Sequence, residues 1–290
     1  MKNTVNTIIV ISGPTASGKT QKAVEFCKKK NGEIISCDSR QVYKYLNIGT
    51  NKGGVLLQNG LREIDKIPQY LTDIMDPDQT YSVADFVEAA DLKILEILNN
   101  NKIPVITGGT GLYIKALLYG LDNMPKADKI LRKTLKAYSQ EELYNKLLKL
   151  DPDTAQKNKN NSQRLLRGLE VNILSGKTLK EHFKHKSPKY VFKHYSISID
   201  KEILYNKIDE RCEYMIKNGM IEETQKVLEM GFKRDCPALS GIGYRLIIEY
   251  LENKISKNDL IAKFSKDTRH YAKRQRTWFK SQPDVEFICS

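Results

Sequence analysis

The sequence predicts an α/β protein with a parallel sheet core and a helical domain inserted into that core. Three observations lead to this prediction. A glycine-rich octapeptide at residues 13–20 stands between an apolar run and a helical pattern. Short apolar runs alternate with helical patterns along residues 8–118, which is typical of a parallel, doubly wound sheet. Between residues 121 and 190 the apolar runs disappear, and a lysine-rich helical pattern replaces them.

The first predicted strand, Ile8–Ile11, leads directly into a phosphate-binding loop. The octapeptide matches the pattern of such loops in full: Gly13, Pro14, Thr15, Ala16, Ser17, Gly18, Lys19 and Thr20. Glycines let backbone N–H groups turn around an anion, and the following helix adds the positive end of its dipole. The lysine adds a point charge, and the last threonine is placed to hold Mg²⁺ against the phosphates. The pattern indicates a di- or triphosphate site; the alternative is a Gly/Ser-rich connector.

Two regular elements follow the loop before the pattern becomes irregular. A helix is predicted at residues 19–30 and a buried strand at residues 33–37. A loop-rich region comes next. Ser82 and Asp85 then form a capping-box pattern that opens an amphipathic helix through Leu98.

A third strand, at residues 103–106, runs into the glycine-rich segment 108–111 and a helix at 112–118. Right-handed crossovers place the carboxyl ends of parallel strands at one edge of the sheet, where ligands bind. We therefore expect Asp38 and Thr110, which follow two of these strands, to lie beside the phosphate loop.

The pattern divides the chain into three segments. Residues 1–120 hold the first part of a phosphate-loop core, residues 121–190 a helical insertion, and residues 191–290 the completion of the core with a basic C-terminal helix. A strand predicted at residues 195–200 returns the chain to the sheet. This organisation is that of a P-loop NTPase, or nucleotide-kinase-like, core with an inserted helical domain.

Basic residues are concentrated in two parts of the chain. The formal net charge is +13. Residues 121–190 carry sixteen Lys and Arg against eight Asp and Glu, and residues 257–280 carry eight against two. In the second stretch Arg269, Lys273, Arg276 and Lys280 recur at helical spacing, with Phe264, Tyr271 and Trp278 on another face. A helix with a basic outer face suits an anionic macromolecule, although many such faces are only solvated.

Asp38 and Arg211 stand out on chemical grounds. Asp38 follows a buried strand beside the phosphate loop, where it could bind metal, act as a general base or cap the next helix. Arg211 occupies an apolar-stripe position between Ile208 and Met215 of a predicted helix at residues 202–217. An arginine that faces inward needs an anion, either a phosphate or the carboxylate of a structural salt bridge.

Composition excludes several other classes. Five scattered cysteines without a Cys-x-x-Cys pair argue against a zinc site and against a disulfide framework. There is no apolar run of about 20 residues and no signal-peptide core, so we expect a cytoplasmic protein without a membrane segment.

Together the motifs resemble those of bacterial tRNA dimethylallyltransferases, the IPP transferase family, over nearly the whole chain. The ordered set is GPTASGKT at 13–20, DSRQVY at 38–43, IGT at 48–50, DP at 76–77 with YS at 81–82 and DF at 85–86, GGTGLY at 108–113, QRLLRGLEV at 163–171, SGIGY at 240–244, YAKRQ at 271–275 and WF at 278–279. The resemblance implies transfer of a dimethylallyl group from its diphosphate to the exocyclic amine of the adenosine 3′ of the anticodon, with Mg²⁺ as cofactor. We expect a monomer.

The resemblance also implies roles for individual residues. It makes Asp38 the base that takes the amine proton, and it places Thr15 to Thr20 and Arg211 on the diphosphate. The tRNA contacts that it implies are Asp38, Ser39, Arg40, Gln41, Thr110, Arg132, Gln163, Arg164, Leu165, Leu166, Arg167, Ser240, Gly241, Ile242, Gly243, Tyr244 and Arg245.

The sequence departs from the family pattern at Pro68-Gln69-Tyr70, where relatives usually carry Pro-His-His or a similar run, so no histidine role is carried over. Three alternatives stay open. A P-loop kinase of a small molecule accounts for residues 13–20 but not for the basic helix. An adenylate isopentenyltransferase would modify a free nucleotide and would not need the basic surplus. A non-enzymatic RNA-binding protein would not need the intact Lys19 and Thr20.

Overall fold

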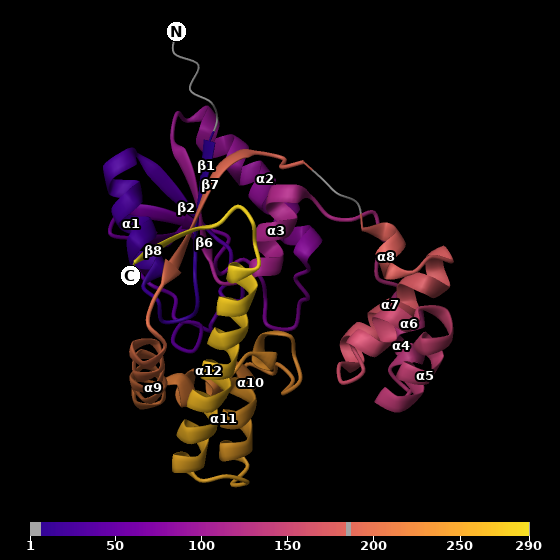
Figure 1. Cartoon of the computed structure of the whole chain (residues 1–290). Helices are drawn as coiled ribbons and strands as arrows, with labels where there is room; N and C mark the ends of the chain where they lie inside the picture. Colours follow the sequence, from indigo (N-terminus) through magenta and orange to yellow (C-terminus); the bar gives the residue numbers. More distant parts are fainter. Residues whose placement is uncertain (1–6, 184–186, 290) are drawn as a thin grey trace. The chain divides into compact units, whose positions relative to one another are not determined.

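A computed structural model describes residues 7–183 and 187–289 of the chain. The chain forms two compact units, and an eight-stranded sheet is the centre of the larger one (Figure 1). The strand order is β3-β4-β5-β2-β6-β1-β7-β8. The strands are β1 Thr7–Ser12, β2 Gly32–Ser36, β3 Val55–Leu56, β4 Arg62–Ile64, β5 Ile67–Tyr70, β6 Ile103–Gly108, β7 Val191–Ser198 and β8 Glu286–Cys289. The six strands from β5 to β8 in this order pair in parallel. The predicted α/β class with a parallel sheet core is confirmed.

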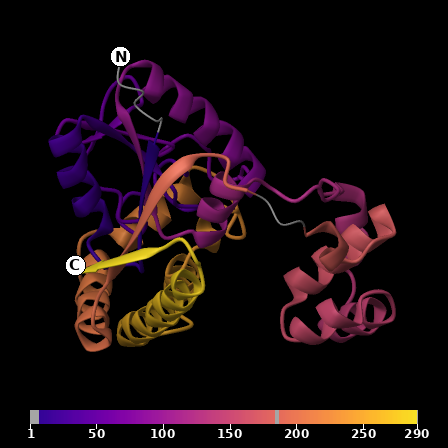
Figure 2. The same ribbon diagram turned by 45° about the horizontal axis from the view of Figure 1, so that its top comes forward.

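Helices cover both faces of the sheet, and the burial of the strands shows why. Ile34 and Ile35 are neighbours on β2, so they point to opposite faces, and both are fully buried. Helix α1 (Lys19–Lys30) covers one face with Ala23, Val24 and Cys27. Helices α2 (Val83–Asn99) and α3 (Gly111–Tyr119) lie on the other side of the strands in Figures 1 and 2. The predicted capping box of α2 is present: Asp85 N–H donates to the Ser82 hydroxyl and Ser82 N–H to the Asp85 carboxylate.

The strands differ from the prediction in two places. The region between β2 and α2, expected to be rich in loops, also contains β3, β4 and β5, which form antiparallel pairs there. Strands of two to four residues are too short for an apolar alternation to reveal them. The strand expected at residues 195–200 spans Val191–Ser198 instead. Asp200 lies outside it because its carboxylate caps the next helix, accepting from Glu202 N–H at 2.7 Å.

A group of helices stands at the carboxyl edge of the sheet, within the same unit. It consists of α9 (Lys201–Lys217), α10 (Met220–Glu229), the 3-10 helix η1 (Ala238–Ser240), α11 (Tyr244–Leu251) and α12 (Lys257–Lys280). Helices α9 and α12 lie side by side in both views (Figures 1 and 2). Leu204, Ile208, Tyr244, Leu260 and Phe264 belong to their common apolar core, which fixes these helices beside the loops that follow β1, β2 and β6.

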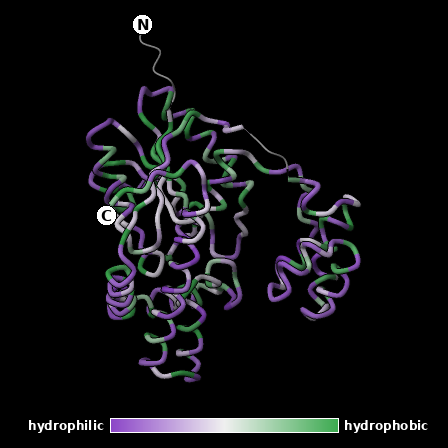
Figure 3. The backbone as a smooth tube through the Cα atoms, viewed as in Figure 1, coloured by the Kyte–Doolittle hydropathy of each residue, from purple (hydrophilic) through white to green (hydrophobic). Residues whose placement is uncertain are grey.

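The second compact unit covers Tyr119–Ser187. Its helices are α4 (Lys129–Leu135), α5 (Gln140–Leu150), α6 (Pro152–Lys157), α7 (Ser162–Ser175) and α8 (Leu179–His182). A small core of Leu135, Leu143, Leu147, Leu165 and Leu169 holds them together. Hydrophilic segments predominate along this part of the tube in Figure 3.

Among the described residues, no helix is both long enough and apolar enough to cross a membrane.

Candidate active site

The loop between β1 and α1 has the backbone of an anion cradle. Gly18 (φ 83°) and Ala16 (φ 64°) adopt left-handed conformations, which turn successive N–H groups inward. A Cβ at Gly13 would lie 2.9 Å from the Ser17 hydroxyl and 3.1 Å from the side chain of Ile197 on β7, so that position has no room for one. Helix α1 has no side-chain N-cap, and its first-turn N–H groups are left for a ligand.

Two half-buried basic side chains lie at this loop, Lys19 and Arg211. Burial, with a smaller contribution from Arg211, lowers the pKa of Lys19 to about 8, although Asp38 opposes the shift. Burial also lowers the pKa of Arg211. Arg211 donates to the Thr15 hydroxyl at 2.5 Å, and its Nε has no hydrogen-bond partner within the described part of the chain. A half-buried guanidinium that is incompletely paired favours an anionic ligand.

Asp38 lies just beyond β2, opposite Arg211. One of its carboxylate oxygens, Oδ1, accepts from the backbone N–H of Arg40 at 2.8 Å, which fixes the turn. The side chain is half-buried and lines the same cavity as Thr15 and Arg211. Turns and no helix follow Asp38, so the helix-cap alternative is wrong, and the turn that its carboxylate closes is compatible with a place in the site.

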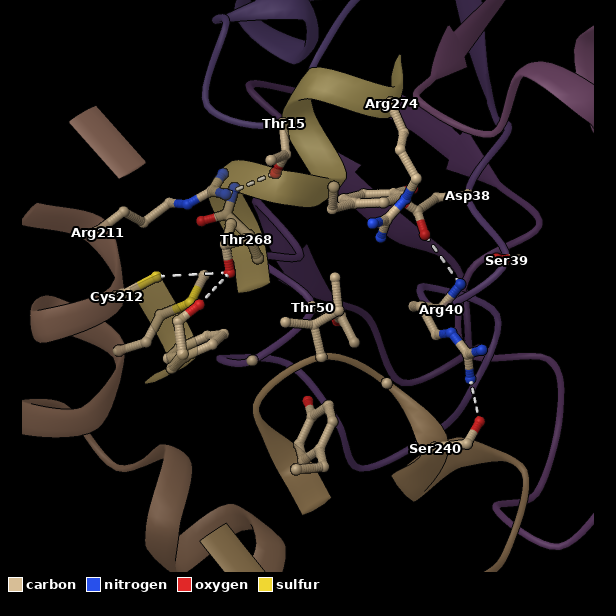
Figure 4. Close-up of a pocket in the computed structure, with 18 residues that line it drawn as sticks. Thr15, Asp38, Ser39, Arg40, Thr50, Arg211, Cys212, Ser240, Thr268 and Arg274 are labelled. Atoms are coloured by element: carbon tan, nitrogen blue, oxygen red, sulfur yellow. Dashed lines mark hydrogen bonds between the residues drawn. The ribbon is translucent and has the colours of Figure 1, made fainter. Parts of the chain in front are cut away.

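A cavity of about 330 Å³ lies between Thr15, Asp38 and Arg211, and Lys19 is not among the residues that line it (Figure 4). Nine residues that the sequence singled out line it: Thr15, Asp38, Ser39, Arg40, Arg211, Ser240, Gly241, Ile242 and Tyr244. They come from the loops after β1 and β2, from α9 and from the segment between η1 and α11. In Figure 4 Thr15 and Arg211 lie together at one side of the cavity, and Arg40 and Ser240 lie together at another. Polar, charged and apolar side chains share the lining.

Hydrogen bonds tie the loop after β2 to its neighbours. Arg40 donates to the Ser240 hydroxyl at 2.9 Å and to the Pro237 carbonyl at 2.8 Å. Ser39 N–H donates to the Thr110 hydroxyl at 3.3 Å, so the ends of β2 and β6 meet as expected.

Gln41 links the same loop to a second segment of the cavity wall. Its Nε2 donates to the Thr50 carbonyl at 3.1 Å, and its Oε1 accepts from the Ser36 hydroxyl at 2.9 Å. Gln69 of β5, which departs from the family pattern, lies beside Gln41. Its Nε2 donates to Oε1 of Gln41 at 3.4 Å. The departure therefore falls next to a predicted tRNA contact.

Glu223 of α10 holds the wall segment that contains Gly49. Its carboxylate accepts from the N–H groups of Asn47, Ile48 and Gly49 at 2.5, 2.7 and 3.1 Å, and from the Tyr244 hydroxyl at 3.0 Å. A Cβ at Gly49 would stand 2.4 Å from the Tyr244 hydroxyl. This side of the cavity is thus fixed by a carboxylate that the sequence did not single out.

The remaining predicted tRNA contacts are distributed differently. Gly243 (φ 91°) begins α11, and Arg245 is exposed on it. In the second unit Gln163 and Arg164 are exposed, while Leu166 is half-buried. The side chain of Leu165 is fully buried in that unit's core, so it is not available for direct contact with a macromolecule.

Arg132 and Arg167 of the second unit share one buried carboxylate. Arg132 makes two hydrogen bonds of 2.8 Å to Glu170, and Arg167 makes one of 2.5 Å. Two guanidinium groups share one carboxylate, so the cluster keeps a net positive charge. The two arginine side chains are partly exposed to solvent.

The predicted basic face of α12 is present with one correction. Lys273 and Lys280 are exposed, and Arg276 is half-buried. Arg269, expected on that outer face, instead contacts both carboxylate oxygens of Asp209 at 2.6 Å. The reason is that α9 and α12 pack side by side, which turns position 269 toward α9.

Sequence reasoning missed other residues of the cavity wall: Gly49, Thr50, Asn51, Cys212, Met215, Phe264, Thr268, Tyr271 and Arg274. Cys212 and Met215 share α9 with Arg211, so the inward arginine was itself a signal for them. Gly49, Thr50 and Tyr271 lie in motifs that carried the resemblance, but no role had been assigned to them. Among the described residues there is no cluster of three or more His, Cys, Asp or Glu that could hold a metal ion.

Comparison with known proteins gives a consistent result. The model of the family described as IPP transferase matches residues 41–282. The chain is 75% identical to a tRNA dimethylallyltransferase of Endomicrobium trichonymphae, over 97% of this chain and 94% of the relative. Among solved structures, a tRNA isopentenylpyrophosphate transferase of Bacillus halodurans is similar, with 34% identity, a TM-score of 0.72 and coverage of 98% and 90% of the two chains. A eukaryotic dimethylallyltransferase, described as acting on tRNA, gives 28% identity, a TM-score of 0.80 and coverage of 98% and 73%.

Proposed function

The chain belongs to the IPP transferase family, and from this premise we propose that it transfers the dimethylallyl group of dimethylallyl diphosphate to tRNA. The acceptor is the exocyclic amine of the adenosine 3′ of the anticodon, and diphosphate is released. One observation carries the proposal: a carboxylate, Asp38, and an incompletely paired, half-buried cation, Arg211, line one cavity beside the phosphate loop. The first suits an amine proton and the second a departing diphosphate.

The electron flow follows from this arrangement. The bond from the first prenyl carbon to the diphosphate oxygen breaks, and its electron pair leaves with the diphosphate. The amine nitrogen forms the new bond to that carbon and loses a proton to Asp38. Charge develops mainly on the leaving oxygens, where Lys19, Arg211 and the N–H groups of the loop stabilise it. An aromatic amine is a weak nucleophile, so a carboxylate within hydrogen-bond reach assists it.

The residues present fit a magnesium ion bound together with the diphosphate. Mg²⁺ usually takes one or two protein oxygens and completes its shell with phosphate oxygens and water. We propose that the Thr20 hydroxyl, at the start of α1, is the protein ligand. Such a site needs no cluster of acidic residues, in keeping with the described part of the chain. The ion would add positive charge at the diphosphate.

The tRNA side of the site is proposed from charge and position. Ser39, Arg40 and Ser240 lie at the cavity, and the exposed Lys273 lies on α12 in the same unit. The unit of residues 119–187 carries exposed Gln163 and Arg164 as further contacts. A target base that is stacked in an anticodon loop must be flipped out to enter a cavity of this kind.

The direct test is incubation with labelled dimethylallyl diphosphate and a choice of acceptors: unmodified tRNA, free AMP and free ATP. We expect label in tRNA alone, at the adenosine 3′ of the anticodon. Label in AMP or ATP would instead identify a free-nucleotide isopentenyltransferase, and phosphate transfer from ATP to a small acceptor would identify a kinase.

Salt dependence tests the basic face of α12. Each phosphate that a basic side chain neutralises contributes roughly −0.7 to −0.9 to the slope of log affinity against log salt. The double variant Lys273→Glu and Arg276→Glu should therefore make the slope for tRNA shallower by about one to two units. The affinity for dimethylallyl diphosphate should hardly change. Filter binding or fluorescence anisotropy across a salt series measures both.

A matched control is Lys29→Glu with Lys30→Glu, which changes the charge equally at the end of α1. That helix end precedes β2 and so lies at the opposite, amino edge of the sheet. For this control variant, the slope of log tRNA affinity against log salt should equal that of the unmodified protein. Equal slopes for all three proteins would show that the face of α12 is only solvated surface.

A further inference from the structure

One buried amide connects the basic helix α12 to the phosphate loop. Gln275 is 5% exposed, and both ends of its side-chain amide are in use. Its Oε1 accepts from the backbone N–H of Thr15 at 2.8 Å, and its Nε2 donates to the carbonyl of Gly109 at 2.9 Å. The side chain thus bridges the loop after β1 and the loop after β6.

The glycine-rich loop after β6 is fitted closely to this helix. A Cβ at Gly109 would stand 2.1 Å from Nε2 of Gln275, and a Cβ at Gly111 would stand 2.1 Å from Nε1 of Trp278. Distances below 3.0 Å require a shift of the neighbours. Glycine at both positions is therefore what allows α12 to approach the loop, and at Gly109 it leaves the space that the Gln275 amide fills.

Only a neutral amide satisfies both contacts. A carboxylate would accept from Thr15 but would face the Gly109 carbonyl oxygen without a proton, and an aliphatic side chain would leave a buried N–H and a buried carbonyl unpaired. The contact matters for the site because Thr15 is held twice. Gln275 holds its N–H, and Arg211 donates to its hydroxyl at 2.5 Å. The backbone amide of Thr15 is therefore directed to Gln275, and its side chain orients Arg211.

We propose that Gln275 is a positioning residue for the diphosphate: it sets Thr15, and through Thr15 the Arg211 guanidinium, in the geometry that receives the leaving group. This inference rests on the proposed function, because the predicted change in turnover refers to prenyl transfer. Under this proposal α12 has two roles: its basic outer face, with the exposed Lys273, is available for tRNA, and its buried Gln275 positions the phosphate loop.

The test compares Gln275→Leu and Gln275→Ala with the unmodified enzyme. A displacement of about 1 Å at reacting groups costs roughly 10²-fold, so we expect kcat to fall on that order, with a KM for dimethylallyl diphosphate raised about tenfold. The tRNA affinity should change little, whereas the unfolding midpoint should fall, because both variants leave a buried N–H and a buried carbonyl unpaired. A control just beyond the end of α12 is Gln282→Leu, whose amide donates to the Trp278 carbonyl and the Ser281 hydroxyl and which should behave as the unmodified enzyme.

Gly109→Ala probes the same contact from the opposite loop. The added methyl group displaces the Gln275 amide, so it should reproduce the loss of the Gln275 variants. In the Gln275→Ala background the methyl group has space, and the double variant should be no worse than either single variant. Independent losses that multiply, or Gln275 variants with unchanged kcat and KM, would overturn the proposal. So would loss of tRNA affinity in parallel with activity.

Binding of inorganic pyrophosphate, measured by calorimetry, separates this inference from the proposed function. If the unmodified protein binds pyrophosphate but transfers no prenyl group to tRNA, the proposed function fails while the role of Gln275 is still measured. In that case, weaker pyrophosphate binding by Gln275→Leu supports the positioning role, and equal binding contradicts it.

Discussion

Lys19→Ala should reduce prenyl transfer by at least about 10²- to 10³-fold, the usual loss when one donor to developing negative charge is removed. The side chain is half-buried at the loop proposed to receive the diphosphate, and burial lowers its pKa to about 8. The variant should still bind tRNA, because the proposed tRNA contacts lie on other elements. Steady-state kinetics and tRNA binding at one pH measure both quantities.

Stability provides a separate readout for this variant. The pKa of Lys19 in the folded chain, about 8, lies below the value of 10.5 for a free lysine, so the charged form disfavours folding at neutral pH. Removing the side chain removes that cost, and the unfolding midpoint should not fall. Lys22→Ala is the matched control, since Lys22 lies on the same helix with an exposed side chain paired to Glu25. Parallel loss of tRNA binding and activity in Lys19→Ala would argue against a role confined to the diphosphate.

Local sequence patterns predicted the parts of the site that depend on one continuous segment. The octapeptide at 13–20 predicted an anion loop because strand, glycines and helix are consecutive in the chain. Arg211 was recognised because a charge in an apolar stripe is visible from helical spacing alone, and the structure places it against Thr15. The comparisons, together with the sheet, confirm the P-loop NTPase-like core.

The parts that sequence reasoning missed depend on contacts between distant segments. Glu223 holds residues 47–49, and Gln275 joins Thr15 to Gly109, across separations of more than 100 residues. No periodicity within α10 or α12 distinguishes these side chains from other polar residues that happen to be buried. Likewise Arg269 fitted a basic outer face by spacing, and only the packing of α9 showed that Asp209 neutralises it.

Asp38→Asn should lower turnover by about 10²- to 10⁴-fold, the contribution of a well-placed general base. An asparagine side-chain oxygen still accepts from the Arg40 N–H, so the turn after β2 and the arrangement of the cavity should persist. What the variant loses is the capacity to take a proton from the amine. We therefore expect nearly unchanged binding of dimethylallyl diphosphate and of tRNA together with a large fall in kcat, measured by single-turnover kinetics with enzyme in excess.

Asp38→Ala separates proton transfer from the structural role, because it removes the acceptor for Arg40 as well. It should show the same loss of turnover with an added loss of stability of roughly 1 kcal/mol, typical of one lost hydrogen bond. Asp200→Asn is the matched control: that carboxylate also caps backbone N–H groups, at the start of α9, but it is not part of the cavity wall. Its turnover should be that of the unmodified enzyme. If Asp38→Asn retained full turnover, Asp38 would be a turn-forming residue only, and the amine proton would have to leave by another route.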